Sequence, residues 1–137
     1  MRLLLISIAI LNLVTGVVIF FAPQFFYDTV PGVRMMGPFN LHFIRDAGLA
    51  YFGSGVLLAL AWRREQYAFA FGGALWPCLH ALFHIQIWLA RGAPADGVAI
   101  TNLLGVQLPA WAALYAGWTL SRNEKQEPVT SPHSAPT

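Results

Sequence analysis

Four long apolar runs constrain the fold of this chain more than any other feature of its sequence. They cover residues 3–22, 39–62, 67–90 and 97–121, and each is 20 to 25 residues long. A helix that spans a bilayer needs about 20 mostly apolar residues, whereas a helix on a soluble core alternates apolar and polar faces. We therefore expect an all-α membrane protein, an antiparallel bundle of four transmembrane helices that forms a single domain of residues 1–121.

Composition agrees with this expectation and excludes some partners. Of the 137 residues, 57% are hydrophobic and only 10% are charged, against roughly a quarter charged in soluble domains. The net charge of +2 is small, and no basic cluster alternates with aromatic residues, so a nucleic-acid partner is not expected. The lipid bilayer is the expected partner, with another membrane subunit or a second copy of the chain as alternatives. The single cysteine, Cys78, excludes an internal disulfide and a multi-cysteine metal site.

The segments around the first and last runs complete the expected domain. A secretory signal peptide is the alternative for residues 3–22, but the following FFAPQFF has no A-x-A-like cleavage site, so we expect a retained helix. The connection 23–38 carries Phe25, Phe26 and Tyr27, which predicts a short aromatic loop in the membrane interface. Residues 122–137 are polar and rich in proline, which predicts a disordered cytoplasmic tail.

The distribution of basic residues predicts the orientation. Lys and Arg are enriched in the cytoplasmic segments that border transmembrane helices. Five basic residues lie at the expected ends that carry the termini, against two at the opposite ends: Arg2, Arg63, Arg64, Arg122 and Lys125, against Arg34 and Arg91. We therefore expect both termini in the cytoplasm.

Several polar residues interrupt the apolar runs and are the candidates for a site. Polar groups inside a membrane are costly and need partners, so they indicate function or specific packing. The candidates are Asn12 and Thr15 in the first run, Asn40, His42, Arg45 and Asp46 in the second, His80 and His84 in the third, and Asn102 in the fourth.

Pairing the helices across their short connections estimates the depth of these residues. This pairing places Arg45, Asp46, His84 and Asn102 with Thr15 in one polar tier, about 8–10 Å below the outer helix ends. Gln107 lies about 140° around its helix from Asn102 and is excluded from the expected site. We expect the tier to converge in the outer half of the bundle.

Two classes of function follow from such a tier. In the first, the protein is an accessory or scaffold protein, and the polar groups only fix helix packing. In the second, it is a quinone-binding or small-molecule-binding oxidoreductase subunit, or a proton-linked transporter, that uses Arg45, Asp46 and His84. The pattern includes no complete catalytic motif, so the catalytic residues are unknown.

A metal site is the third alternative. His80 and His84 share one helix face, and with His42 and Asp46 they would suit Zn, Fe or Cu. Haem held by His42 and one third-helix histidine is a further variant. At about 4–6 Å the positive charge of Arg45 would oppose a divalent ion by several kcal/mol. We therefore expect no bound metal and no cofactor.

A resemblance supports the expected architecture. The stretches FFAPQFFYD, GPFNLHFIRDAGLAYFGSG and HALFH resemble small bacterial four-helix membrane proteins of unknown function. More loosely, residues 1–121 resemble the DoxX-like group in helix number, helix length and the pattern from Arg45 to Leu49. The resemblance implies a bacterial inner membrane, and because some members of the DoxX-like group are linked to quinone-coupled sulfur oxidation, it also favours the quinone alternative. The resemblance carries over no site residue.

Overall fold

The computed structural model describes residues 1–126, and this part of the chain is helical without strands. Four of its helices are long and apolar enough to cross a membrane, which confirms the expected helix content. The helices are α1 (Arg2–Phe21), α2 (Pro23–Thr29), the short 3₁₀ helix η1 (Val33–Met36), α3 (Leu41–Arg64), α4 (Tyr67–Ala90), α5 (Gly97–Asn102), the π-helical turn η2 (Leu103–Gln107) and α6 (Leu108–Gln126).

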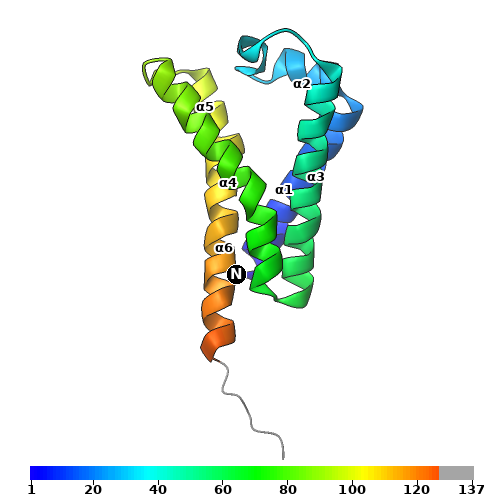
Figure 1. The fold of residues 1–137 in the computed structure, drawn as a ribbon, viewed down its shortest axis with the longest axis vertical. Helices are drawn as coiled ribbons and strands as arrows, with labels where there is room; N and C mark the ends of the chain where they lie inside the picture. Colours follow the sequence, from blue (N-terminus) through cyan, green and yellow to red (C-terminus); the bar gives the residue numbers. More distant parts are fainter. Residues whose placement is uncertain (127–137) are drawn as a thin grey trace, which may run out of the picture.

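The long helices follow one another side by side. Figure 1 shows the chain rising through α1, descending through α3, rising again through α4 and descending through α6. The bounds of α4 are the predicted ones, while α3 begins two residues later than predicted, at Leu41. Asn40 sets this start, because its side-chain oxygen accepts a hydrogen bond from the backbone N–H of Phe43 at 3.1 Å.

Small residues hold the long helices together where they pack most closely. α1 and α3 approach at Gly16, where a Cβ would lie 2.7 Å from the carbonyl oxygen of Gly48. Close approach through small residues is how membrane helices gain contact area, because lipid supplies no hydrophobic drive for association. The main core cluster is mostly alanine and comes from all four long helices: Leu5, Ile8, Ala9, Leu58, Ala61, Ala70, Ala74, Ala113 and Ala116.

α3 and α4 separate as they leave the turn that joins them. They lie together near this turn, and α4 leans away from α3 toward its other end (Figure 1). Pro77 lies inside α4, where it removes one backbone hydrogen bond and bends the helix. The connection after α2 lies against α5, since a Cβ on Gly32 would lie 2.7 Å from Cγ1 of Val98.

The connection between α1 and α3 is ordered by its own contacts. The Tyr27 hydroxyl donates a hydrogen bond to the carbonyl of Gly37 at 2.8 Å. Asp28 accepts hydrogen bonds from Gln24 at 3.0 Å and from Nε of Arg34 at 3.1 Å. These two partners, Gln24 first, lower the pKa of the Asp28 carboxyl below its ordinary value.

The last membrane segment differs from its prediction in two ways. It is interrupted by the π-helical turn η2, which the apolar run did not indicate. It also extends to Gln126, so residues 122–126, expected in a disordered tail, are helical. The reason is local, because no glycine or proline follows Gly117 until Pro128. The rest of the predicted tail, 127–137, lies outside the described residues.

Candidate functional site

The polar residues that were expected to converge lie in separate groups. His42 and Asp46 form an exposed pair on α3, with Nε2 and Oδ2 3.4 Å apart. Arg45 turns to α1, where its Nε donates to the carbonyl of Phe20 at 3.3 Å and its guanidinium lies 5.4 Å from the ring centre of that residue. The structure therefore does not bring Arg45 and Asp46 to His84.

Helix geometry explains why this part of the tier does not form. Tyr51 marks the side of α3 that faces α4, because its ring contacts His80 at 6.1 Å between centroids. At about 100° per residue, His42 lies about 180° and Asp46 about 140° around the helix from Tyr51. The side chain of His42 is 90% exposed. The depth of a residue along the bundle carries no information about the direction in which its side chain points.

The same geometry removes the proposed metal ligand set. Within the described part of the chain, no three His, Cys, Asp or Glu side chains lie close enough together to hold a metal ion. The set of His42, Asp46, His80 and His84 is therefore not assembled, and His42 does not reach the third-helix histidines for a shared haem. His80 and His84 alone would offer an ion two ligands, against four in a typical structural zinc site.

Asn12 belongs to a second group, which is fully hydrogen-bonded. Its side-chain amide donates to Oγ of Ser54 at 2.9 Å, and Ser54 donates to the carbonyl oxygen of Gly73 at 2.5 Å. The three residues tie α1, α3 and α4 together, and Asn12 and Ser54 are buried. Thr15 lies half-buried one turn further along α1. Ser54 was not among the expected site residues, because an isolated serine among apolar residues gives no pattern.

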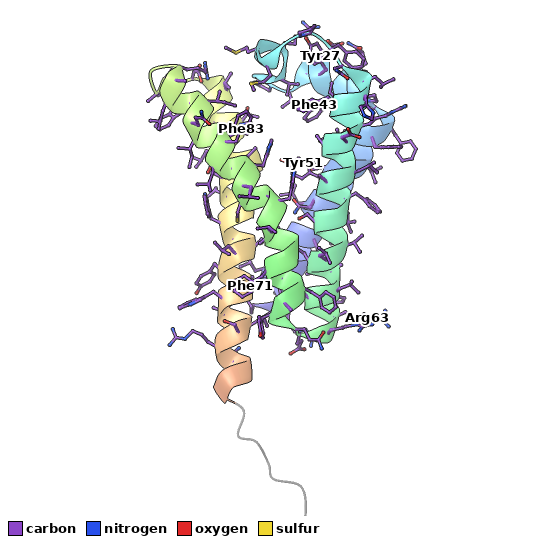
Figure 2. The ribbon with its side chains drawn as sticks, in the orientation of Figure 1. Tyr27, Phe43, Tyr51, Arg63, Phe71 and Phe83 are labelled. Atoms are coloured by element: carbon purple, nitrogen blue, oxygen red, sulfur yellow. The ribbon has the colours of Figure 1, made fainter. Side chains whose placement is uncertain are left out.

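A third group, the histidine cluster, consists of Tyr51, Trp76, His80 and His84. The His80 ring stacks on Trp76 with centroids 4.8 Å apart and planes at 12°. His84 meets the edge of His80 at 4.5 Å, and Tyr51 meets Trp76 edge-on at 4.8 Å. Phe83 extends the cluster outward, 6.3 Å from His84. Figure 2 shows Tyr51 on α3 on the side toward α4, with Phe43 further along α3 and Phe83 further along α4.

Within residues 1–126, the polar atoms of the histidine cluster have no hydrogen-bond partner. Among residues 1–126, no hydrogen bond joins the imidazole nitrogens of His80 or His84, or the hydroxyl of Tyr51, to another group. These residues are half-buried, yet no fully enclosed polar side-chain atom in this part of the chain lacks a partner. The free nitrogens and the hydroxyl are therefore not fully enclosed, and they lie on helices long and apolar enough to cross a membrane.

Asn102 lies apart from the histidine cluster, against Gln107. The Gln107 amide nitrogen donates to the Asn102 side-chain oxygen at 3.3 Å and to the carbonyl of Ala81 at 2.9 Å. The exclusion of Gln107 was wrong, and the π-helical turn is the reason. Its i→i+5 hydrogen bonding brings residues five apart to the same side of the helix. An angle of 100° per residue does not hold across such a turn.

Comparisons of the chain with protein families, with curated proteins and with solved structures find no match. The chemistry of the site is therefore argued from its groups. Two imidazoles and a phenol can donate hydrogen bonds to oxygen atoms or accept them. The neighbouring rings of Trp76 and Phe83 offer faces and edges to a planar molecule. Such a set suits a flat, lipid-soluble ligand with oxygen atoms at its edge.

Proposed function

We propose that this protein is an integral membrane protein of a bacterial inner membrane, an antiparallel four-helix bundle with both termini in the cytoplasm. Exposed apolar side chains on the long helices, such as Leu3 at 82% and Phe21 at 77%, suit contact with lipid. At the end proposed to be cytoplasmic, Arg2 forms a salt bridge of 2.8 Å with Glu65, beside two further arginines of the α3–α4 turn. The aromatic connection 23–38 then lies in the outer interface.

Cysteine labelling tests this topology. In a Cys78→Ala background, single cysteines at positions 30 and 130 are exposed to a membrane-impermeant maleimide on intact spheroplasts. The proposal expects labelling at 30, and labelling at 130 only after lysis. Labelling at 130 but not at 30 in intact spheroplasts would reverse the orientation.

The function that the geometry supports best is the binding of a small lipid-soluble molecule of the quinone class at the histidine cluster. One observation carries this proposal: within residues 1–126, the nitrogens of His80 and His84 and the hydroxyl of Tyr51 have no hydrogen-bond partner and are not fully enclosed. On helices that span a membrane, a polar group that lacks a partner costs several kcal/mol. A ligand oxygen beside these groups would remove that cost.

A quinone matches the chemistry of the histidine cluster. Its ring carbonyls accept hydrogen bonds, which an imidazole N–H or the Tyr51 phenol would donate. Its planar ring would pack against the exposed part of Phe83 and beside Trp76, and its apolar tail would leave between α3 and α4 into the bilayer. The resemblance to the DoxX-like group, some members of which are linked to quinone chemistry, agrees with this proposal.

A second candidate is an accessory or scaffold function, and the hydrogen-bonded network of Asn12, Ser54 and Gly73 favours it. This network has the properties of a purely structural one, because its members are buried and hydrogen-bonded to one another. The histidine cluster lacks these properties. The two candidates therefore predict different effects for substitutions in the two groups.

Titration with a short-tailed benzoquinone tests the binding function. The protein in lipid nanodiscs is titrated while quenching of its tryptophan fluorescence is followed, and His84→Leu is compared with the wild type. Loss of one hydrogen bond to the ligand should weaken binding by about 2-fold to 10-fold.

His42→Leu is the matched control, because His42 is exposed on the far side of α3 and should leave the affinity unchanged. Equal affinity of all three proteins, or no saturable quenching in the wild type, would refute quinone binding at this cluster. It would leave the scaffold function as the better account.

A further inference from the structure

A second concave site lies between the outer part of α4 and the segment formed by α5, η2 and the start of α6. We call it the α4–α6 groove, and its volume is about 600 Å³, within the range of pockets that hold small ligands. Its apolar lining includes Ile85, Trp88, Ile100, Leu103, Leu108 and Trp111. Asn102 and Gln107 are the polar side-chain amides in this lining.

The hydrogen bonds around Gln107 fix which atom of the groove remains free. The carbonyl of Ala81 can only accept, and it receives a hydrogen bond from the Gln107 nitrogen at 2.9 Å. The indole N–H of Trp111 can only donate, and it donates to the Gln107 oxygen at 3.0 Å. These two partners fix the orientation of the Gln107 amide.

The orientation of Asn102 follows from that of Gln107. The Gln107 nitrogen also donates to Asn102, so the Asn102 atom that faces it is the oxygen, at 3.3 Å. The Asn102 amide nitrogen is then the free group, and within residues 1–126 it has no hydrogen-bond partner and is not fully enclosed. An amide nitrogen offers only donors. The groove therefore selects an apolar ligand that brings an acceptor oxygen.

We propose that the α4–α6 groove binds a bilayer glycerolipid, whose acyl chain fills the apolar lining and whose ester carbonyl accepts a hydrogen bond from Asn102. The depth of Asn102 favours an ester over a deeper group. Asn102 lies five residues after Gly97, the first residue of α5, which places it about 7–8 Å below that helix end. The interfacial layer that covers the hydrocarbon is about 5–8 Å thick on each side, and the ester groups lie at its inner edge.

Lipid retention by the purified full-length chain tests the proposal. The protein is equilibrated in mixed micelles with equal amounts of two phosphatidylcholines, one ester-linked and one ether-linked, and the lipid that remains bound after gel filtration is measured by mass spectrometry. The ether lipid has the same chains without the carbonyl. We expect the wild type to retain the ester lipid about 2-fold to 10-fold better than the ether lipid, and Asn102→Leu to lose this preference.

Two neighbouring leucines supply controls that leave the Asn102–Gln107 hydrogen bond in place. Leu103 lines the groove and Leu104 does not, although both are exposed on the same turn. Leu103→Trp should reduce retention of both lipids, and Leu104→Trp should retain both at the wild-type level.

Three results would overturn the proposal. The first is equal retention of ester and ether lipid by the wild type, and the second is a preference that survives Asn102→Leu in a variant that still elutes as the folded protein. The third is displacement of the bound lipid by a stoichiometric amount of short-tailed benzoquinone. This last result would assign the acceptor oxygen to a quinone instead of an ester. Because this site shares no residue with the histidine cluster, its failure leaves the proposed function untouched.

Discussion

The close approach of α1 and α3 at Gly16 predicts that a single methyl group there weakens the fold. In Gly16→Ala the new Cβ would lie 2.6 Å from the backbone nitrogen of Phe52, 2.9 Å from its Cα and 2.7 Å from the carbonyl oxygen of Gly48. Carbon contacts are normally about 3.5–4.0 Å. All three neighbours are backbone atoms, so no side-chain rotation can make room. The two helices would have to separate by roughly 1 Å.

The expected size of the effect combines two opposing terms. Overpacking of a filled interface costs about 1–3 kcal/mol. Replacing glycine with alanine inside a helix returns about 0.8–1 kcal/mol. We therefore expect Gly16→Ala to lower the free energy of unfolding by up to about 2 kcal/mol, which corresponds to a fall of up to about 8 °C in the melting temperature of a domain this size.

Gly53→Ala is the matched control on the same helix pair. Nothing lies within 4 Å of a Cβ at Gly53, so only the helix-propensity gain remains. We expect this variant to be as stable as the wild type or slightly more stable. Both variants are measured by circular dichroism during heating in the same detergent. Equal melting temperatures for Gly16→Ala and Gly53→Ala would show that α1 and α3 do not approach as closely as described.

Three further predictions concern single side chains. Ser54→Ala removes the hydrogen bonds that join α1, α3 and α4 and should lower the free energy of unfolding by about 1–3 kcal/mol. Its control is Ser121→Ala, which loses only a hydrogen bond within one helix. The control should lower the melting temperature much less than Ser54→Ala. His84→Leu should leave the melting temperature unchanged, because no hydrogen bond within the described part of the chain is lost. A large fall in the melting temperature would favour a purely structural role for His84. The pKa of the Asp28 carboxyl is lowered mainly by its hydrogen bond with Gln24. The ionised carboxylate therefore stabilises the connection after α1 fully at pH values above 3.8, the ordinary pKa of aspartate. This stabilisation is lost as the pH falls through the lower pKa of the folded protein. Proteolysis of this connection should therefore accelerate on acidification below that value, less so in Asp28→Asn, and an equal acceleration in both proteins would argue against the assigned role.

The helices could be predicted from the sequence because membrane crossing sets a strict length for an apolar run. The segment Tyr67–Ala90 was placed at its observed bounds, since charged residues and a tight turn limit it on both sides. The π-helical turn at Leu103–Gln107 could not be predicted, because its residues are as apolar as their neighbours. That single turn decided whether Gln107 could reach Asn102.

The candidate site was predicted in part. His80 and His84 were correctly placed on one helix face, because residues four apart share a face wherever the helix is regular. The orientation of Arg45 toward Phe20 could not be obtained from depth, since it depends on how α3 is rotated against α1. Whether the polar atoms of the histidine cluster find hydrogen-bond partners depends on the separation of α3 and α4. No local pattern in the sequence records that separation.

Nitrogen NMR of the histidine side chains tests the proposed quinone site most directly. The chain has four histidines, so uniform ¹⁵N-histidine labelling gives few imidazole signals, and His80→Gln and His84→Gln assign two of them. On addition of a short-tailed benzoquinone to the protein in nanodiscs, the account predicts shifts of the His80 and His84 nitrogens and an unchanged signal from His42. Unchanged signals from His80 and His84 at saturating quinone, or equal shifts of His42, would contradict it.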